Sequence, residues 1–168
     1  MGRGRMGERV FIAIGSNLGD REANCRSAIE HLKGDPRVRV IKESAFYETE
    51  PWGKTEQPAF INAAVEIETD LAPKELLALL KNIEDRVGRK ARERWGPREI
   101  DLDIIFYGDR VIKEEGLTIP HPEAHNRRFV IEPIAEMAPE FIHPVLEEKL
   151  YDILIRLHNR PVRNERKE

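Results

Sequence analysis

Two amphipathic segments, each set between β-rich runs, constrain the fold of this sequence more than any other feature. A β-rich run over residues 9–15 is followed by a turn and a helix that Asp20 can cap and that extends to Lys33. A long extended segment over residues 38–50 and a strand over residues 60–68 come next. Apolar and polar residues alternate in the latter strand, which predicts that one of its faces is covered.

The second amphipathic segment is expected to form a helix over residues 73–87. Pro73 suits a first helical position, and Gly88 suits a stop. The apolar stripe of this helix consists of Leu76, Leu80, Ile83 and Val87. A strand over residues 99–107 follows, and the sequence at 108–109 predicts a hairpin-type turn into residues 111–112. One face of that strand is expected to carry Ile100, Leu102, Ile104 and Phe106.

The order β-α-β-β-α-β predicts an α+β fold of the ferredoxin-like type, with helices on one face of an antiparallel sheet. C-terminal additions follow: a proline-rich stretch expected to consist mostly of loops, and a final helix over residues 146–157. We expect a single domain over residues 1–168, in which residues 1–8 and 161–168 are flexible tails.

Composition excludes several classes of protein. The 168 residues include 28 Lys and Arg against 31 Asp and Glu, a net charge of −3, which removes the case for a nucleic-acid-binding protein built on net positive charge. The single cysteine, Cys25, excludes a disulfide framework. The apolar run after the basic N-terminus is too short for a signal or a membrane span. We expect a soluble, monomeric, cytoplasmic protein without membrane or nucleic-acid partners.

Asp101 and Asp103 are the sharpest local feature. On a strand their carboxylates point to one side, roughly 6–7 Å apart along the chain, while Leu102 points to the other. Two such carboxylates repel each other unless a cation lies between them. Mg²⁺ is usually held by one or two carboxylates together with phosphate oxygens. The alternative is an exposed polar strand face, and the residues directly upstream favour the metal site.

Those upstream residues form a basic segment over residues 81–98, where seven cations accompany three carboxylates. The cations are Lys81, Arg86, Arg89, Lys90, Arg92, Arg94 and Arg98. On charge alone, a solvated helix end explains the segment equally well. The planar guanidinium groups of these arginines can donate paired hydrogen bonds to phosphate oxygens, and Trp95 could stack on a base or fix the loop. Next to Asp101 and Asp103, they describe a site for a nucleotide polyphosphate.

Several other residues indicate a function only when they are considered together with this predicted nucleotide site. His121 and His125 would by themselves be ordinary surface histidines, and no cluster has the spacing of zinc ligands. The amide of Asn62, on the same predicted strand face as Phe60, could read a lactam-like heterocycle edge, although a buried, satisfied amide is the commoner outcome. Residues 15–20 lack the phosphate-loop pattern and are better explained as a turn and a helix cap.

In this order, the motifs closely resemble those of the 6-hydroxymethyl-7,8-dihydropterin pyrophosphokinase family of folate biosynthesis. The resemblance extends from about Val10 to about Pro144, and its most specific part is Arg-Trp-Gly-Pro-Arg at 94–98 followed by Asp-Leu-Asp at 101–103. The other motifs are Gly-Ser-Asn-Leu-Gly at 15–19, Pro-Trp-Gly at 51–53, Gln-Pro at 57–58, Phe-x-Asn-Ala-Ala-Val at 60–65, Gly-Arg at 88–89 and Pro-His at 120–121.

The resemblance implies a ferredoxin-like enzyme that transfers the β,γ-diphosphate of ATP to the hydroxymethyl oxygen of the dihydropterin and releases AMP. Asp101 and Asp103 would hold two Mg²⁺ ions, and with Arg89 and Arg98 they form the implied catalytic set. The implied ATP-binding residues are Glu84, Arg89, Arg92, Trp95, Arg98, Ile104, Thr118, His121 and Arg127. The implied pterin pocket consists of Thr49, Pro51, Trp52, Gly53, Phe60, Asn62 and Phe129, with the ring between the two phenylalanines.

One departure and two alternatives accompany this resemblance. Ala91 stands where many members of the family have a second arginine, and Arg92 comes next. An RNA-binding module of the same fold would explain the basic loop but not Asp101 and Asp103, whose charge would repel phosphate without a metal. A metal-dependent phosphohydrolase would use the same carboxylates on water. No residue is assigned as a general base.

Overall fold

The computed structural model of this protein describes residues 7–49, 59–88 and 99–159. Its elements keep the predicted β-α-β-β-α-β order, except that the second strand is divided into β2 and β3, and others are added at the C-terminal end. In chain order they are β1 (Glu8–Ser16), α1 (Arg21–Lys33), β2 (Val38–Glu43), β3 (Tyr47–Thr49), β4 (Phe60–Thr69), α2 (Pro73–Val87), β5 (Asp101–Tyr107), β6 (Ile112–Glu114), β7 (Leu117–Ile119), the short 3₁₀ helix η1 (Ala124–Asn126), α3 (Arg128–Met137) and α4 (Leu150–His158).

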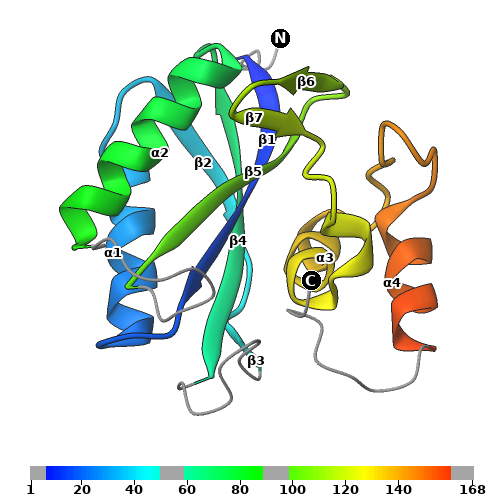
Figure 1. The fold of residues 1–168 in the computed structure, drawn as a ribbon, viewed down its shortest axis with the longest axis horizontal. Coiled ribbons are helices and arrows are strands. Elements are labelled where there is room, and N and C mark those ends of the chain that lie inside the picture. Colours follow the sequence, from blue (N-terminus) through cyan, green and yellow to red (C-terminus); the bar gives the residue numbers. More distant parts are fainter. Residues whose placement is uncertain (1–6, 50–58, 89–98, 160–168) are drawn as a thin grey trace, which may run out of the picture.

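The main sheet is antiparallel, with the strand order β2-β4-β1-β5 (Figure 1). The short strand β3 pairs with the other end of β4, next to Phe60. This is the ferredoxin-like arrangement, so the predicted fold class is confirmed. The turn after β5 exists, with Gly108 at a φ of 56°. It leads into β6, which pairs with β7 in a separate two-stranded sheet rather than with β5.

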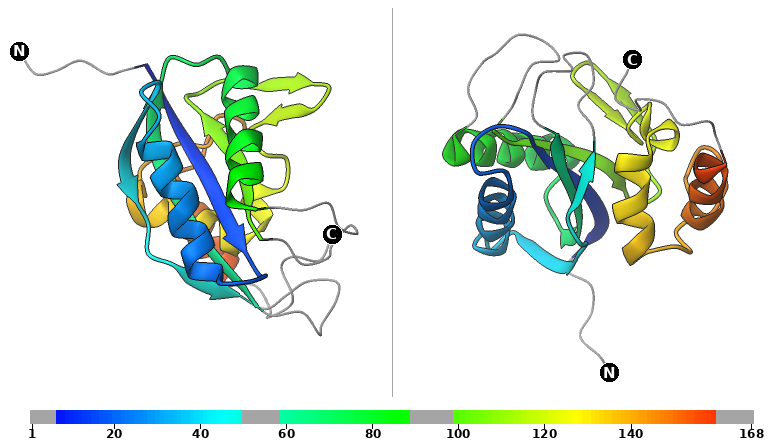
Figure 2. Two further views of the ribbon diagram at one scale, coloured as in Figure 1. Left: turned by 90° about the vertical axis from the view of Figure 1, so that its left-hand side faces the viewer. Right: turned by 90° about the horizontal axis from the view of Figure 1, so that it is seen from below.

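Helices cover both faces of the sheet. α1 and α2 lie on one face, and α3 lies on the opposite face with α4 packed behind it, as the two views of Figure 2 show. We call these the α1/α2 face and the α3 face. The two helices of the ferredoxin-like core thus share one face, as predicted, whereas the C-terminal additions cover the other face with helices, which the sequence did not predict. Strand β4 shows the consequence, because nine of its ten residues are buried, on both faces.

The α1/α2 face follows the predicted pattern. Leu76, Leu80 and Ile83 of α2 are buried, and Val87 packs partly buried against them. Asp20 caps α1, since its carboxylate accepts a hydrogen bond of 3.2 Å from the backbone N–H of Ala23. Periodicity and capping therefore predicted this face correctly.

The α3 face contains a helix that the sequence did not predict. A proline inside a helix removes one backbone N–H and clashes with the preceding turn, so the proline-rich stretch indicated loops. Pro133 nevertheless lies within α3. Its neighbours Ile131, Ile134 and Ala135 are buried between the sheet and α4. Apolar burial of this kind outweighs the cost of one proline.

Three predicted boundaries also changed. The extended segment 38–50 is interrupted at Ser44, whose backbone N–H donates to Ala64 O (2.9 Å) and whose hydroxyl accepts from Ala64 N (2.9 Å). The final helix starts at Leu150 instead of 146, because the preceding residues form a turn around His143. Strand β1 starts at Glu8, inside the segment predicted as a tail, while residues 1–6 and 160–168 lie outside the described residues.

A β-bulge in β5 changes which face its last residues occupy. Phe11 of β1 pairs with Phe106, yet the next residue, Ile12, pairs with Ile104, so Ile105 is the extra residue. Phe106 therefore packs on the α3 face, edge-on to Phe11 at a ring separation of 6.3 Å. The prediction that Phe106 shares a face with Ile104 was wrong, because alternation along the sequence cannot register a bulge.

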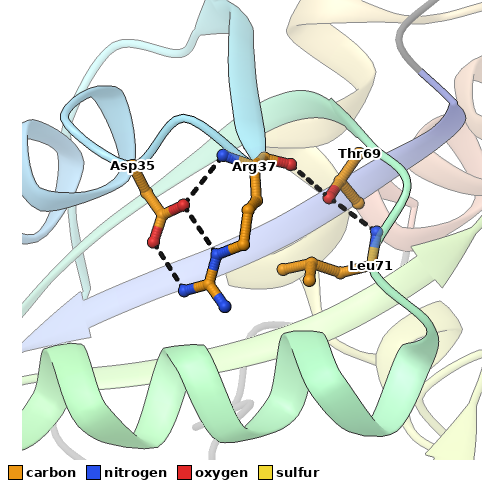
Figure 3. Close-up of polar contacts among 4 residues, drawn as sticks. All are labelled: Asp35, Arg37, Thr69 and Leu71. Atoms are coloured by element: carbon orange, nitrogen blue, oxygen red, sulfur yellow. Dashed lines mark hydrogen bonds and ion pairs between the residues drawn. The ribbon is translucent and has the colours of Figure 1, made fainter.

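A polar clip joins two loops at the far end of the sheet (Figure 3). The Arg37 guanidinium donates to both carboxylate oxygens of Asp35, at 3.0 and 2.8 Å, and holds the pKa of that carboxyl below its usual value. The carbonyl of Arg37 accepts from the Thr69 hydroxyl (2.6 Å), which in turn accepts from Leu71 N–H (3.1 Å). The turn before β2 is thereby tied to the corner between β4 and α2.

Candidate functional site

One row of residues crosses the α3 face at the end of the sheet. Gly15 of β1 pairs with Asn62 of β4 on one side and with Asp101 of β5 on the other, and Asn62 also pairs with Tyr47 of β3. Directly opposed residues of antiparallel strands project to the same face. Because neighbouring strands lie about 4.8 Å apart, the backbones of Asn62 and Asp101 are about 10 Å apart, with a glycine between them.

The next row on the same face has a similar arrangement. Ala13 pairs with Ala64 on one side and with Asp103 on the other. Small side chains therefore form the floor of the sheet surface between Asn62 of β4 and the two carboxylates of β5. A flat ligand could lie over such a floor with one edge at Asn62 and the other at Asp101.

The two carboxylates point as predicted. Ile100 and Leu102 are buried in the α1/α2 core, so Asp101 and Asp103 project from the opposite face. Asp101 is half-buried and Asp103 is exposed. Their oxygens are hard ligands on one side of one strand, which is the donor set that Mg²⁺ prefers.

The segment after β7 brings basic groups towards these carboxylates. The backbone N–H of His121 donates to Ile105 O (3.1 Å), which fixes the segment beside β5. Burial and the nearby Arg127 guanidinium lower the pKa of His121, while Glu123 and Asp101 act in the opposite direction. His121 Nδ1 accepts from Glu123 N–H (3.2 Å), so the proton of the neutral ring is on Nε2. His121 is thus a hydrogen-bond donor in the electrostatic reach of Asp101.

The candidate residues of the implied pterin pocket near the start of β4 are also brought together. Asn62 is buried, and its Nδ2 donates to Thr49 Oγ1 at 2.7 Å, which sets the orientation of the amide. Phe60 pairs with Thr49 across the two strands and is buried. Phe129, at the start of α3, is buried on the same face of the sheet, with the Arg127 guanidinium 5.9 Å from its ring centre.

Other candidate residues lie elsewhere. Ile104 is buried in the α1/α2 core, and Glu84 is buried on α2, where its Oε2 accepts the backbone N–H of Leu102 at 2.8 Å. Glu84 therefore joins α2 to the strand that carries the two aspartates. Thr118 is exposed on β7, opposite Lys113. Seven candidates lie outside the described residues: Pro51, Trp52, Gly53, Arg89, Arg92, Trp95 and Arg98.

A groove on the α1/α2 face is separate from all of these candidates. It measures about 340 Å³ between α1 and α2, and His31, Asp35, Leu79 and Arg86 contribute to its lining.

No helix among the described residues is long and apolar enough to cross a membrane. In the same part of the chain, no group of three or more His, Cys, Asp or Glu side chains has the geometry of a metal site.

Sequence reasoning missed Gly15, Tyr47 and Glu136. Gly15 shares its row with Asn62 and Asp101, and Tyr47 begins the strand that carries Thr49. Glu136 of α3 accepts hydrogen bonds from the backbone N–H of Ala45, just before β3, and from the Tyr47 hydroxyl. A pairing register between the strands would have found the first two, whereas Glu136 lies in the unpredicted helix.

Comparisons with known proteins agree on one family. The model of the 7,8-dihydro-6-hydroxymethylpterin-pyrophosphokinase family matches residues 11–139. A 2-amino-4-hydroxy-6-hydroxymethyldihydropteridine pyrophosphokinase of Methylorubrum extorquens is 44% identical over 134 residues, which cover 80% of this chain and 85% of that protein. The Bacillus subtilis protein of the same name is 45% identical over 135 residues, covering 80% and 81%.

A solved structure shares the fold. Wild-type Plasmodium falciparum HPPK-DHPS with pteroate superimposes with a TM-score of 0.70 at 16% sequence identity. The match covers 93% of this chain but 43% of that longer one, so it supports the fold alone. The family model and the relatives above 40% identity extend over the strands that carry Asn62, Asp101 and Asp103, and this chain belongs to the 7,8-dihydro-6-hydroxymethylpterin-pyrophosphokinase family.

Proposed function

We propose that the α3 face between β4 and β5 is the active site at which this chain carries out the reaction of its family. In that reaction the hydroxymethyl oxygen of 6-hydroxymethyl-7,8-dihydropterin loses its proton to solvent and bonds to the β-phosphorus of ATP. The bond from the β-phosphorus to the oxygen of the α-phosphate breaks, and AMP leaves. The main support for the proposal is the row in which Gly15 lies between Asn62 and Asp101. This row places the Asn62 amide, which could bind the edge of the heterocycle, and the Asp101 carboxylate, which could bind the metal, on one surface of the sheet.

Asp101 and Asp103 are proposed to hold Mg²⁺, and two ions are expected. The support is chemical: both offer carboxylate oxygens, the hard ligands that Mg²⁺ prefers, on the same face of β5. When bound, Mg²⁺ would neutralise charge on the triphosphate. His121, donating from Nε2, and Arg127 are proposed to bind phosphate oxygens from the other side.

Thr49, Asn62, Phe60 and Phe129 are proposed to bind the pterin. An amide offers a donor and an acceptor side by side, which suits the edge of the pterin's pyrimidinone ring. The hydrogen bond from Asn62 to Thr49 supports this role, because an amide held in one orientation presents its remaining groups in fixed directions. Phe60 and Phe129 supply apolar surface for the faces of the ring.

The remaining assignments rest on the family resemblance. Arg89, Arg92, Trp95 and Arg98 are proposed for the ATP site, and Pro51, Trp52 and Gly53 for the pterin pocket. Glu84, Ile104 and Thr118 belong to the proposed ATP set as well. For Glu84 we favour a role through the backbone of β5, since its carboxylate binds Leu102 N–H between the two aspartates. We also propose that the chain acts as a monomer.

Product analysis tests the proposal directly. The purified protein is incubated with ATP and Mg²⁺, with and without 6-hydroxymethyl-7,8-dihydropterin, and the nucleotide products are separated. AMP that forms only with the pterin, together with a pterin diphosphate, is the expected outcome. ADP and inorganic phosphate without the pterin would indicate a phosphohydrolase instead. Asn62→Ala should abolish pterin binding while ATP binding persists, which tests the location of the pocket.

A further inference from the structure

The carboxylate of Glu136 clamps the segment that leads into β3. Ala45 N–H donates to Oε1 and Oε2 at 3.2 and 3.1 Å, and the Tyr47 hydroxyl donates to Oε1. Glu136 lies in the last turn of α3, 89 residues away from Tyr47 in sequence. Burial, together with the hydrogen bond to Glu136, raises the pKa of Tyr47, so its hydroxyl stays protonated as a donor. The clamp is therefore a tertiary contact between α3 and the strand edge.

The clamped strand has few other attachments among the described residues. β3 contains three residues, pairs with the beginning of β4, and accepts one side-chain hydrogen bond at Glu48 from Arg21 (2.9 Å). Strands this short are weakly held by their ladder alone. The preceding bend is anchored twice. Ser44 binds the backbone of Ala64 on β4, and Lys42 Nζ donates to Met137 O at the end of α3 (3.2 Å). Glu136 completes this attachment on the side next to β3.

The position of β3 determines the orientation of the Asn62 side chain, which we propose binds the pterin. Tyr47 opposes Asn62 across the pairing, and Thr49 at the other end of β3 accepts the hydrogen bond from the Asn62 amide. A shift of β3 moves the Thr49 hydroxyl and breaks that hydrogen bond. The same helix carries Phe129 in its first turn, so α3 links one wall of the proposed pocket to the strand that orients its polar group.

We propose that Glu136 is a positioning residue for pterin recognition, which acts through Ala45 and Tyr47 to hold β3 so that Thr49 orients Asn62. Glu136 does not itself touch the substrate. The inference rests on the proposed function, because it takes Asn62 and Thr49 as pterin-binding residues. It goes beyond that function by assigning a role to a side chain outside the pocket.

The test measures the two substrates separately in the full chain. Dissociation constants for 6-hydroxymethyl-7,8-dihydropterin, with a non-hydrolysable ATP analogue and Mg²⁺ present, and for that analogue alone are determined by calorimetry. Because small misplacements of binding groups cost up to about 100-fold, Glu136→Ala should weaken pterin binding by about 10- to 100-fold. Nucleotide affinity should stay within about twofold, because the clamp is on the β4 side of the site.

Two milder variants keep the test valid if Glu136→Ala fails to fold. Glu136→Gln retains one acceptor oxygen, and Tyr47→Phe removes one donor, so each should weaken pterin binding by a smaller factor of roughly fivefold. The double variant of Tyr47→Phe and Glu136→Gln should lose less than the product of the two single losses, since both break the same hydrogen bond. Glu140→Gln is the matched control, because its carboxylate pairs with Lys149 at the surface and not with β3.

The outcomes separate this inference from the proposed function. If Asn62→Ala abolishes pterin binding and the Glu136 and Tyr47 variants do not weaken it, the positioning role is refuted while the site stands. If Asn62→Ala leaves pterin binding unchanged, the proposed site itself is wrong. A merely structural clamp predicts parallel losses of pterin affinity, nucleotide affinity and thermal stability, and that pattern would also overturn the inference.

Discussion

The two faces of the sheet are covered by different kinds of side chain. The α1/α2 face is filled by aliphatic side chains such as Leu76, Leu80 and Ile83, with few polar groups in its core. The α3 face contains aromatic rings together with buried polar groups. Arg9 donates to the buried carboxylate of Glu66 at 2.7 Å and lies 5.1 Å from the ring centre of Phe11.

This difference separates two tasks of the fold. An apolar face can change in detail and still stabilise the sheet, because hydrophobic burial is not directional. Hydrogen-bonded groups on the α3 face have fixed partners, and they lie on the same side of the sheet as Asn62, Asp101 and Asp103. We infer that the α1/α2 face mainly supplies stability, whereas the α3 face supplies stability and positions the site. The first two predictions below compare a change on one face with a change on the other.

The largest difference is expected between adjacent residues of β5. Asp103→Asn should lower Mg²⁺-dependent turnover by about 1,000-fold, roughly 4 kcal/mol of barrier, and the variant should stay folded because the side chain is exposed and keeps its size. Leu102→Ala, on the other face, should cost about 2–5 kcal/mol of unfolding free energy while each folded molecule keeps its activity. Turnover of the Asp103 variant within tenfold of the wild type would contradict its assignment to the metal.

Matched core truncations provide the second comparison. Leu80→Ala on α2 and Ile134→Ala on α3 both shorten fully buried side chains, and each should cost about 2–5 kcal/mol in chemical denaturation. Only Ile134→Ala should also weaken pterin binding, because α3 carries Phe129 and Glu136. Equal effects of both variants on pterin affinity would show that the two faces do not differ in this way.

The α1/α2 face could be predicted from the sequence because its signals are local. The stripe on α2, the cap at Asp20 and the stop at Gly88 all depend on residues within a few positions of each other. The ferredoxin-like order follows from these local signals together with the alternating strands. Asp101 and Asp103 were also placed correctly on one strand face, because the two residues lie before the bulge in β5.

The α3 face could not be predicted in the same way because its signals are long-range. Pro133 indicated a loop, and only packing between the sheet and α4 makes the helix favourable. The bulge at Ile105 moved Phe106 to the other face, and no local pattern marks an extra residue in a strand. The contact between Tyr47 and Glu136 joins residues 89 positions apart. Three-dimensional pairing was needed to find each of these features.

The third prediction concerns pH and His143, which is 3% exposed on the α3 side. Its Nδ1 accepts the backbone N–H groups of Val145 and Leu146, at 3.1 Å each. Burial, and next His125, lower the pKa of His143 from 6.5 to about 4, although Glu148 opposes them. Since the unfolded chain binds the proton more readily, unfolding free energy should rise between about pH 4 and 6.5, by up to about 3 kcal/mol.

Two variants separate the titration of His143 from its hydrogen bonds. His143→Asn keeps an acceptor oxygen for the two N–H groups but does not titrate, so it should flatten the pH dependence and remain folded at pH 7. His143→Leu removes the acceptor and should lose stability at pH 7 as well. Urea unfolding at pH 4.5 and 7 measures both effects. An unchanged slope in His143→Asn would mean that other groups cause the pH dependence.

The smallest expected effects come from two neighbours at the start of α1. Asp20 only caps the helix, so Asp20→Ala should cost about 1 kcal/mol of unfolding free energy, Asp20→Asn almost nothing, and neither should change substrate affinity. Arg21 instead reaches the edge of the site, donating to Glu48 of β3 (2.9 Å) and to Ala59 O (2.7 Å). Arg21→Ala should therefore weaken pterin binding by a few-fold at a similar or smaller cost in stability. If Asp20→Ala weakens pterin binding as much as Arg21→Ala does, the α1/α2 face also positions the site, and the division between the two faces fails at this end of the sheet.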